Sequence, residues 1–563
     1  MTFDKIMTRT FQILLVLFFA ITASSAILGF LGVYSTVAQF LLTFTLALAI
    51  YLLFCKKVQN DEIECTAHLP GWLTILLFGM GLLILVALVL IPVGRWPLSH
   101  AGDWFPWDAG AYHFPKAVEL MTGGSIWDMS IAYADYPFGY ESLLAMALLI
   151  TGDTALFGFV HVLIVLFFIS AFWMAARRIT KMDGGLLFFL IVMLLLSDHF
   201  FQFLNMWRVF TLDIYTVGKN DILAAASILA VIVSFYKTQD SFQDGMPGFA
   251  LASGLAASIK PNTLYVLFPL WLFLFMRFYR EKLAALVGYV LLLIPGLLWL
   301  VRNFMALGSY ASADASRLAG WSIASNLANP NFYQNIPKNL FLVLAIVLIE
   351  IVLALKNKED HFWNAIIAVV LFIGFISTPV TAYFGATDAP PTINWRFGEA
   401  LLAFLAALVV NDVAQILRAW KWNSTIKRVG VGTLAVLSVA AGGWLLFDQR
   451  AMLQSVPENA YILHDQFAQP VGVDGYYSAY DYVQRNAHHA TVWVENGLPF
   501  YVYDAAFSNT VSRQQEADYV VGFRTDWFGE GRSEYPTLIG ILLDNDSYRV
   551  IYQDSEGIVL KRR

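Results

Sequence analysis

Long apolar runs separated by short polar segments dominate the chain from its N-terminus to residue 449. A helix needs roughly 20 consecutive apolar residues to cross the hydrocarbon core of a bilayer. The runs therefore predict about 13 membrane-spanning helices. They lie near 11–31, 36–54, 71–94, 155–176, 184–203, 220–236, 247–259, 263–279, 283–301, 338–355, 362–379, 398–417 and 429–447.

One further apolar run, 139–151, is too short for a full crossing, and the predicted topology depends on it. Cytoplasmic segments carry an excess of Lys and Arg. If this run lies in the membrane plane and the N-terminus is cytoplasmic, the basic clusters between spans all fall on the cytoplasmic side. If the run crosses, every later cluster moves outside. We therefore expect an in-plane or re-entrant helix, with loops 96–140, 303–337 and 380–396 on the external side.

The pattern changes after residue 449, where apolar runs become short and charged residues return. Alternating apolar and polar positions predict strands, and longer mixed segments predict helices. The expected strands are 491–495, 518–523 and 548–552, and the expected helices are 475–486 and 534–543. We therefore expect two domains, a transmembrane domain over 1–449 and an external α/β domain over 450–563. The second domain carries no nucleophile motif or metal-ligand spacing, which favours an accessory binding role.

The composition agrees with this division. Of the 563 residues, 58% are hydrophobic and 13% are charged, whereas soluble domains carry about 25% charged residues. The fold class is therefore an α-helical polytopic membrane protein with a small α/β domain. A net charge of −6 with no basic tract gives no indication of nucleic-acid binding, and two cysteines do not make a disulfide framework.

A polar segment from Ser99 to Tyr140 interrupts the apolar pattern between two spans. Its aromatic residues, Trp107 and Tyr112 among them, lie close in sequence to Asp108 and His113. Amphipathic rings at this density are typical of structure at a membrane interface. The segment is either an interfacial anchor with incidental acids or an active-site loop, and we favour the active-site loop.

Ionisable residues inside or at the edge of a bilayer are costly and are functional candidates by default. The predicted topology places one such set at the external face: Asp108, His113, Lys219, Asp221, Lys260, Arg302 and Arg396. Lysine and arginine at one membrane depth are suited to hold a phosphate anion. A carboxylate beside them is suited to act as a general base.

Each of these residues also has a structural interpretation. Arg302 and Arg396 are placed where interfacial arginines extend toward water, and Lys219 and Asp221 are spaced for a local ion pair. Asp108 is placed to cap a helix over 109–121. Lys260 is harder to explain structurally, because Pro261 follows it and apolar segments flank it.

Several of these residues lie in motifs that resemble the GT-C superfamily of polytopic glycosyltransferases, which includes protein mannosyltransferases and aminoarabinose transferases. The resemblance covers roughly residues 70–420 and rests on an ordered set of segments. They are WDAGAYHFPKAVELMTGG, DYPFGYESLLAMALLITGD, GKNDILAA, GLAASIKPN, Pro295–Gly296 to Arg302–Asn303, and NWRFGEALLA.

The resemblance implies transfer of a sugar from a polyprenyl-phosphate or polyprenyl-diphosphate carrier. It implies catalytic roles for Asp108 and Asp221 and a donor-phosphate contact for Lys260. Asp108 is followed by Ala109 where the family carries a second acid, so a divalent metal on Asp108 and Asp221 stays an open question.

The sequence thus predicts an inverting glycosyltransferase at the outer face of a cytoplasmic membrane, acting on a glycan, lipid or protein acceptor. Asp108 is the expected base, and Lys219, Lys260, Arg302 and Arg396 are the expected phosphate contacts. His113 is expected to orient Asp108 or to bind the sugar. The rings of Trp104, Trp107 and Tyr112 are expected to stack on sugar faces or to shield the site from water. The alternative is a transporter or lipid flippase in which the same charges line a pathway. The absence of a clear inverted repeat and the gathering of the charges at one face oppose that alternative.

Overall fold

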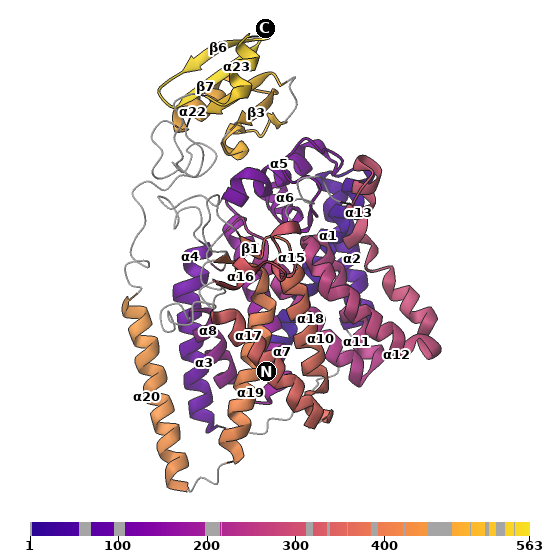
Figure 1. Cartoon of the computed structure of the whole chain (residues 1–563), viewed down its shortest axis with the longest axis vertical. Coiled ribbons are helices and arrows are strands. Elements are labelled where there is room, and N and C mark those ends of the chain that lie inside the picture. The colour runs from indigo at the N-terminus through magenta and orange to yellow at the C-terminus, as the bar shows by residue number, and fades with distance from the viewer. Residues whose placement is uncertain are drawn as a thin grey trace.

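The helices of a computed structural model form an upright bundle, with a small sheet domain at one end of its long axis (Figure 1). The structure describes residues 3–55, 69–94, 107–196, 214, 217–310, 319–334, 338–356, 358–383, 392–419, 424–448, 476–495, 497–512, 517–524, 535–544 and 546–563. Four further residues that the sequence places near the external face lie outside the described residues: Asp103, Trp104, Asp198 and His199.

Nine helical segments within the described residues are long and apolar enough to cross a membrane. They are α1 (Phe3–Leu31), α2 (Thr36–Ile50) with η1 (Tyr51–Cys55), α3 (Gly71–Leu85) with η2 (Val86–Leu90) and α4 (Ile91–Gly94), α7 (Phe157–Thr180), α10 (Asp221–Asp240), η7 (Pro261–Thr263) with α12 (Leu264–Val290), α17 (Lys338–Lys356), η9 (Trp395–Gly398) with α19 (Glu399–Ala419), and α20 (Ser424–Asp448). Shorter apolar helices are α6 (Gly139–Thr151), α8 (Gly184–Leu195), α13 (Ile294–Leu307) and α18 (Lys358–Ser377).

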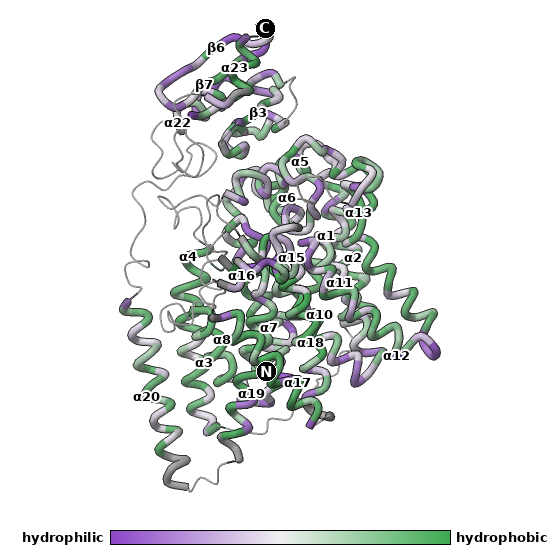
Figure 2. Tube along the Cα trace, in the orientation of Figure 1, coloured by the Kyte–Doolittle hydropathy of each residue, from purple (hydrophilic) through white to green (hydrophobic). Residues whose placement is uncertain are grey.

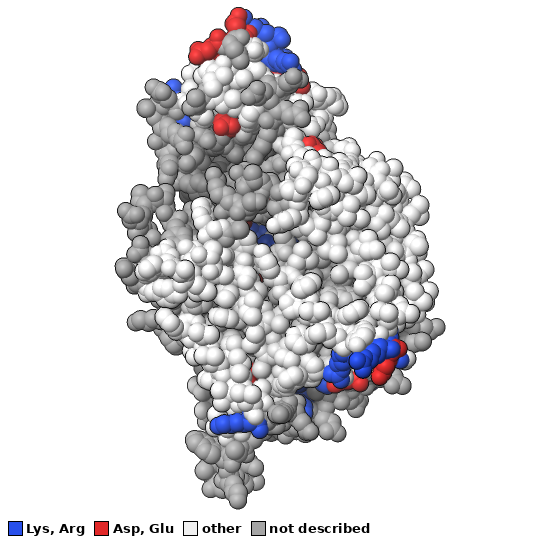
Figure 3. Space-filling view, turned by 45° about the vertical axis from the view of Figure 1, so that its right-hand side comes forward, with Lys and Arg blue, Asp and Glu red and all other residues white. Residues whose placement is uncertain are grey.

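The surface of the bundle is suited to lipid. The helices are predominantly apolar along their length (Figure 2). In the space-filling view the charged side chains gather toward the two ends of the molecule, and a broad band between them is almost free of charge (Figure 3). Peripheral helices such as α2 and α20 bury only 17% of their most apolar window. The protein is therefore a multi-pass membrane protein, and the predicted fold class is confirmed.

Two predicted spans are arranged differently from the expectation. The sequence predicts separate helices at 263–279 and 283–301, but α12 continues to Val290 and α13 begins only at Ile294. Lys282 has non-helical backbone angles (φ −131°, ψ 20°) and marks a kink at which two helices meet within α12, so the predicted break is present. The second of these helices ends at Val290, which is earlier than predicted. The short run 139–151 forms α6, whose 13 residues extend roughly 20 Å, less than the hydrocarbon thickness.

Small residues allow the central helices to approach closely. A Cβ added to Gly139 on α6 would overlap the backbone of Ser258 on α11 (Phe242–Ile259), and a Cβ on Gly296 would overlap the Gly254 carbonyl. Close backbone approach at small residues is how helices pack where lipid replaces water. This packing holds α6, α11 and α13 together beneath the polar segment.

That polar segment contains η4 (Ala109–His113), a π-helix, followed by α5 (Phe114–Gly123). The remaining short elements in this part of the chain are η8 (Ala319–Trp321), α15 (Ile323–Asn326), α16 (Pro330–Gln334), β1 (Ala382–Tyr383) and β2 (Thr392–Ile393). Strands β1 and β2 pair antiparallel, with Ala382 opposite Ile393.

The C-terminal domain contains a five-stranded mixed sheet in the order β4-β3-β5-β7-β6. Its elements are α22 (Tyr476–Asn486), β3 (Thr491–Glu495), η10 (Pro499–Val502), β4 (Thr510–Val511), β5 (Tyr519–Phe523), α23 (Thr537–Asp544), β6 (Tyr548–Gln553) and β7 (Gly557–Arg562). Strand β3 is parallel to β4 and β5, whereas β7 is antiparallel to β5 and β6. The three predicted strands and two predicted helices are present. Strands β4 and β7 were not predicted.

The C-terminal domain contacts the polar segment directly. The rings of Phe500 and Phe114 are 5.1 Å apart. The buried Glu119 carboxylate on α5 accepts a hydrogen bond from the Tyr503 hydroxyl at 2.7 Å and another from the Val511 amide at 2.8 Å. The two domains are therefore joined by apolar and polar contacts beside η4.

Candidate active site

The π-helix η4 begins immediately after Asp108. The Asp108 side chain makes no capping hydrogen bond, so it is not used to start the helix. Its carboxylate instead accepts a hydrogen bond from the Arg396 guanidinium, with Nη1 to Oδ2 at 3.0 Å. π-Helical turns occur frequently at functional sites. The Asp108 side chain thus binds Arg396 and does not cap the helix.

The GKND segment brings Asp221 to the same place. Gly218 has φ +99°, and a Cβ there would overlap Ala109 of η4. Because only glycine combines this backbone conformation with such close approach, the loop before α10 lies directly on η4. The Gly218 amide donates to the Tyr140 hydroxyl at 3.0 Å. Asp221 then occupies the first turn of α10, with a side chain 2% exposed.

Lys260 reaches this carboxylate from the end of α11. It has extended backbone angles (φ −145°, ψ 139°), and Pro261 begins the next helical turn. The Lys260 ammonium pairs with Asp221 Oδ1 and lies 4.6 Å from the centre of the Phe397 ring. Proline disfavours a helical conformation for the residue before it. The KP dipeptide therefore ends α11 and turns the lysine toward Asp221.

Arg396 links the two acids. It lies in η9, the short helix that precedes α19, and its side chain is 28% exposed. Besides its bond to Asp108, its Nε lies 3.9 Å from Asp221 Oδ2. Lys219 adds a further favourable electrostatic interaction with Asp221. Four segments therefore contribute to one charged cluster, the acid–cation cluster: Asp108, Lys219, Asp221, Lys260 and Arg396.

Aromatic rings border this cluster. Tyr112 and Tyr133 have ring centres 4.8 Å apart, and Trp107 lies 6.2 Å from Tyr112 and 6.1 Å from Tyr133. Burial, together with the negative charge of Asp108, raises the pKa of Tyr112 well above its ordinary value. Its hydroxyl therefore stays protonated at neutral pH and is available as a hydrogen-bond donor. Tyr133 was not singled out from the sequence.

His113 belongs to a neighbouring buried group. Its Nδ1 lies 2.8 Å from Glu141 Oε1, and the Lys116 ammonium lies 3.3 Å from the same oxygen. Lys116 also donates to the Pro137 carbonyl at 3.1 Å. His113 is 2% exposed and Lys116 is fully buried. The structure thus gives His113 a carboxylate partner other than Asp108. Lys116 and Glu141 were not singled out from the sequence, although both lie in the aromatic-rich motif segments on either side of residues 125–134.

Arg302 lies apart from the acid–cation cluster and is fully buried. Its guanidinium donates to the carbonyls of Ile126 at 3.1 Å and Ala134 at 2.6 Å, and to Asn303 Oδ1 at 2.7 Å. The Asn303 side chain in turn donates to the Asp135 carbonyl at 2.6 Å. The Arg–Asn pair therefore holds the polar segment onto α13, and its donors are directed at protein oxygens.

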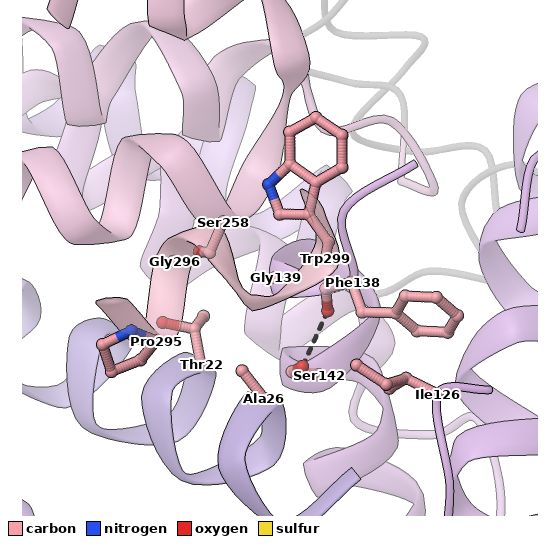
Figure 4. Close-up of a pocket in the computed structure, with 10 residues that line it drawn as sticks. All are labelled: Thr22, Ala26, Ile126, Phe138, Gly139, Ser142, Ser258, Pro295, Gly296 and Trp299. Atoms are coloured by element: carbon pink, nitrogen blue, oxygen red, sulfur yellow. Dashed lines mark hydrogen bonds between the residues drawn. The ribbon is translucent and has the colours of Figure 1, made fainter. Parts of the chain in front are cut away.

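A small cavity lies beside Phe138, whose ring also contacts Lys116. Its lining residues come from α1, α6, α11, α13 and the polar segment: Thr22, Ala26, Ile126, Phe138, Gly139, Ser142, Ser258, Pro295, Gly296 and Trp299 (Figure 4). The cavity has a volume of about 20 Å³, room for about one water molecule. It is too small to hold a sugar or a lipid headgroup.

A metal ion on Asp108 and Asp221 would need further ligands from nearby side chains. Their carboxylates contact Arg396 and Lys260. Within the part of the chain that the structure describes, neither acid belongs to a group of three or more His, Cys, Asp and Glu side chains spaced to hold an ion. The two acids are instead held by Lys260 and Arg396, an arrangement suited to stabilise negative charge with cationic side chains.

No protein-family model and no curated protein matches the chain. Two solved structures that resemble it are crystal structures of ArnT from Cupriavidus metallidurans. The one bound to undecaprenyl phosphate has a TM-score of 0.48, and the one in the apo state has 0.44. Each is 14% identical, and they cover 87% and 86% of this chain and 98% and 97% of theirs. At these values the functional proposal rests on the geometry of the site.

Proposed function

We propose that this protein is a glycosyltransferase that moves a sugar from a polyprenyl-phosphate-type lipid donor to an acceptor at the outer face of a cytoplasmic membrane. The observation that carries the proposal is the contact of Arg396 with both Asp108 and Asp221, with Lys260 on the second acid. The segments that supply these residues are the ones that resemble GT-C motifs. A lipid-linked donor fits a site built at the ends of membrane helices.

Lys260 and Arg396 form the donor-phosphate contacts, with Lys219 adding positive charge. The cluster carries three cations and two acids, so one positive charge remains to attract an anionic donor. A guanidinium binds two oxygens of a phosphate at once. Asp221, nearly inaccessible to solvent, holds both cations in place before the donor arrives.

Asp108 is the general base. The donor phosphate competes for Arg396, which releases the Asp108 carboxylate toward the acceptor. Asp108 then takes the acceptor hydroxyl proton while the acceptor oxygen forms a bond to the anomeric carbon. The bond from that carbon to the phosphate oxygen breaks, and its electron pair stays on the phosphate. Lys260 and Arg396 stabilise this growing charge, which is the electrostatic contribution to catalysis. Direct displacement inverts the anomeric centre.

The aromatic border supplies the sugar contacts. Trp107, Tyr112 and Tyr133 present flat rings and hydroxyl groups beside Asp108. The C-terminal domain, held to α5 and η4, is an accessory domain on the same side as the site. It is suited to bind the acceptor or to stabilise the polar segment.

The proposal is tested with protein purified in mild detergent. Mass spectrometry of co-purifying lipids should identify a polyprenyl-phosphate sugar, and reconstituted protein should transfer radiolabelled sugar from such a donor. The anomeric configuration of the product should be the opposite of the donor's. Movement of lipid across the membrane without sugar transfer would support the flippase alternative and overturn the proposal.

A further inference from the structure

A second cluster of ionisable side chains lies inside the helix bundle, far from the acid–cation cluster. Glu350 on α17, His361 on α18 and Asp412 on α19 each offer one ligand atom, and these atoms all lie within 4.8 Å of one another. Glu350 is 1% exposed and His361 4% exposed. The three helices contact one another and lie side by side (Figure 1). We call this set the Glu–His–Asp cluster.

The length of helix α10 indicates how far the Glu–His–Asp cluster lies from the candidate active site. Asp221 is in the first turn of α10, and fifteen residues later the Tyr236 hydroxyl donates to Asn364 Oδ1 at 2.5 Å. Asn364 is one turn after His361 on α18 and interacts with the Glu350 carboxylate. Fifteen residues of α-helix span roughly 22 Å. The two clusters therefore occupy opposite ends of the same helices.

With a neutral His361 imidazole, the two acids of the Glu–His–Asp cluster have no cationic partner among the described residues. Glu350 Oε1 lies 2.8 Å from His361 Nδ1. The Asn364 amide also acts on the carboxylate, but Glu350 Oε2 is buried and has no partner with hydrogen-bond geometry. The charged groups that act on Glu350 are His361 and Asp412, and within the described residues no Lys or Arg forms a salt bridge with either acid. A buried carboxylate without a cation is costly.

We propose that the Glu–His–Asp cluster binds a divalent transition-metal ion, with Zn²⁺ the best match. Two carboxylates and a neutral imidazole carry a formal charge of −2, so a divalent ion makes the buried group neutral. Zn²⁺ is bound by His nitrogen with Asp or Glu oxygen, whereas Ca²⁺ and Mg²⁺ prefer oxygen ligands alone. The unpartnered Glu350 oxygen is the atom that the ion would satisfy.

The ion would connect α17, α18 and α19 at the end of the bundle opposite to the active site. Glu350 and His361 flank the turn between α17 and α18, and Asp412 lies near the end of α19. Metal binding to a preformed site contributes directly to folding stability. The ion is thus structural, and its binding does not depend on the proposed transferase activity.

The test uses full-length protein purified through an affinity tag without histidines and without chelator. Mass spectrometry of the metals should find about one Zn²⁺ per chain in wild type. In His361→Gln and Asp412→Asn it should find roughly a tenth of that or less, because loss of even an outer-shell partner weakens metal sites 10- to 100-fold. His488→Gln, which removes a half-exposed histidine of the C-terminal domain, should retain the metal.

A second measurement keeps the test decisive if His361→Gln does not fold. Zn²⁺ added to chelator-treated wild type should raise its melting temperature, and Asp412→Asn, altered at the partly exposed ligand, should not respond. Wild type that contains no metal and is not stabilised by Zn²⁺ or Mn²⁺ would overturn the proposal. Equal metal content in wild type and both variants would also overturn it, since the ion would then lie elsewhere.

Discussion

The two clusters at opposite ends of α10 and α19 solve the problem of buried charge in different ways. In the acid–cation cluster, Asp108 and Asp221 have cationic partners, and the side chains of Lys260 and Arg396 are 12% and 28% exposed. In the Glu–His–Asp cluster, Glu350 has a histidine partner and an unpartnered oxygen. The first set lies at helix ends and in the short segments beside them, whereas the second set joins three packed helices, α17, α18 and α19.

This difference shows why the two clusters suit different ligands. Side chains at helix ends and in short loops exchange partners with little cost, as a transient anionic substrate requires. Side chains within packed helices are held by the neighbouring turns. They are suited to a resident ion. The charge balance agrees. The first cluster has a surplus cation, whereas among the described residues the second has two acids that form no salt bridge with Lys or Arg.

The largest expected effect is on the rate of sugar transfer, and it tests whether catalysis depends on the acid–cation cluster alone. Asp108→Asn keeps shape and polarity but cannot accept a proton, so the transfer rate should fall roughly 10²- to 10⁴-fold. Donor binding should remain, because Lys260 and Arg396 are intact. The assay is transfer from a radiolabelled polyprenyl-phosphate sugar in membranes. Asp412→Asn is the control, and an equal loss of turnover in Asp412→Asn would remove the distinction between the clusters.

The second prediction compares two arginines that the sequence placed in one set. Arg302 is buried and bound to protein carbonyls, so Arg302→Ala should lower the free energy of unfolding by at least about 3 kcal/mol. Arg396→Ala should lower it by less, because Arg396 is 28% exposed and Asp221 keeps its Lys260 partner. Thermal unfolding in detergent measures both. Loss of donor binding in a fully stable Arg302→Ala protein would place Arg302 at the donor phosphate.

The third prediction concerns Glu119, a buried acid outside the spans that forms no salt bridge with the residues that the structure describes. Burial, with a smaller contribution from the negative charge of Asp128, raises its pKa from 4.5 to about 7, against the opposing effect of the hydrogen bonds from Tyr503 and Val511. The docked carboxylate therefore binds a proton more tightly than the undocked one. Contact with the C-terminal domain should be strongest below pH 4.5 and weaken as the pH rises through 7. The change is on the order of 3 kcal/mol.

Hydrogen–deuterium exchange of residues 499–512 at pH 5 and pH 8 measures this dependence. Protection should decrease at the higher pH in wild type. Glu119→Gln is neutral at both values, so its protection should not change with pH. A pH response of the same size in Glu119→Gln would assign the titration to another group.

The smallest expected effect concerns the donor-phosphate contacts. Lys260→Ala and Arg396→Ala should each weaken kcat/KM for the lipid donor roughly 10- to 100-fold, the value of one charge-assisted hydrogen bond. Arg178→Ala is the control, since Arg178 pairs with Asp240 at the far end of α10 and is 42% exposed. Unchanged kinetics in both variants would separate the cluster from donor binding.

The sequence by itself determined where the long helices lie and where strands β3, β5 and β6 lie. Apolar runs and alternating positions are local signals, so α7, α10, β3 and β5 lie where they were predicted. The two-residue strand β4 has too few positions to show alternation, whereas the predicted break near Lys282 is present as a kink. The motif segments also identified Asp221, Lys260 and Arg396 as candidates, because charged residues beside apolar runs are conspicuous.

Only the tertiary structure decided which of these charges meet. Arg302 and Arg396 look alike in sequence, yet one binds backbone carbonyls and the other binds Asp108, 288 residues away. Glu350 and Asp412 were not singled out from the sequence, although acids within apolar runs are functional candidates. Only the packing of α17, α18 and α19 brings His361 to them. Glu119 meets Tyr503 across 384 residues. Such contacts depend on where helices cross, and no local pattern encodes that.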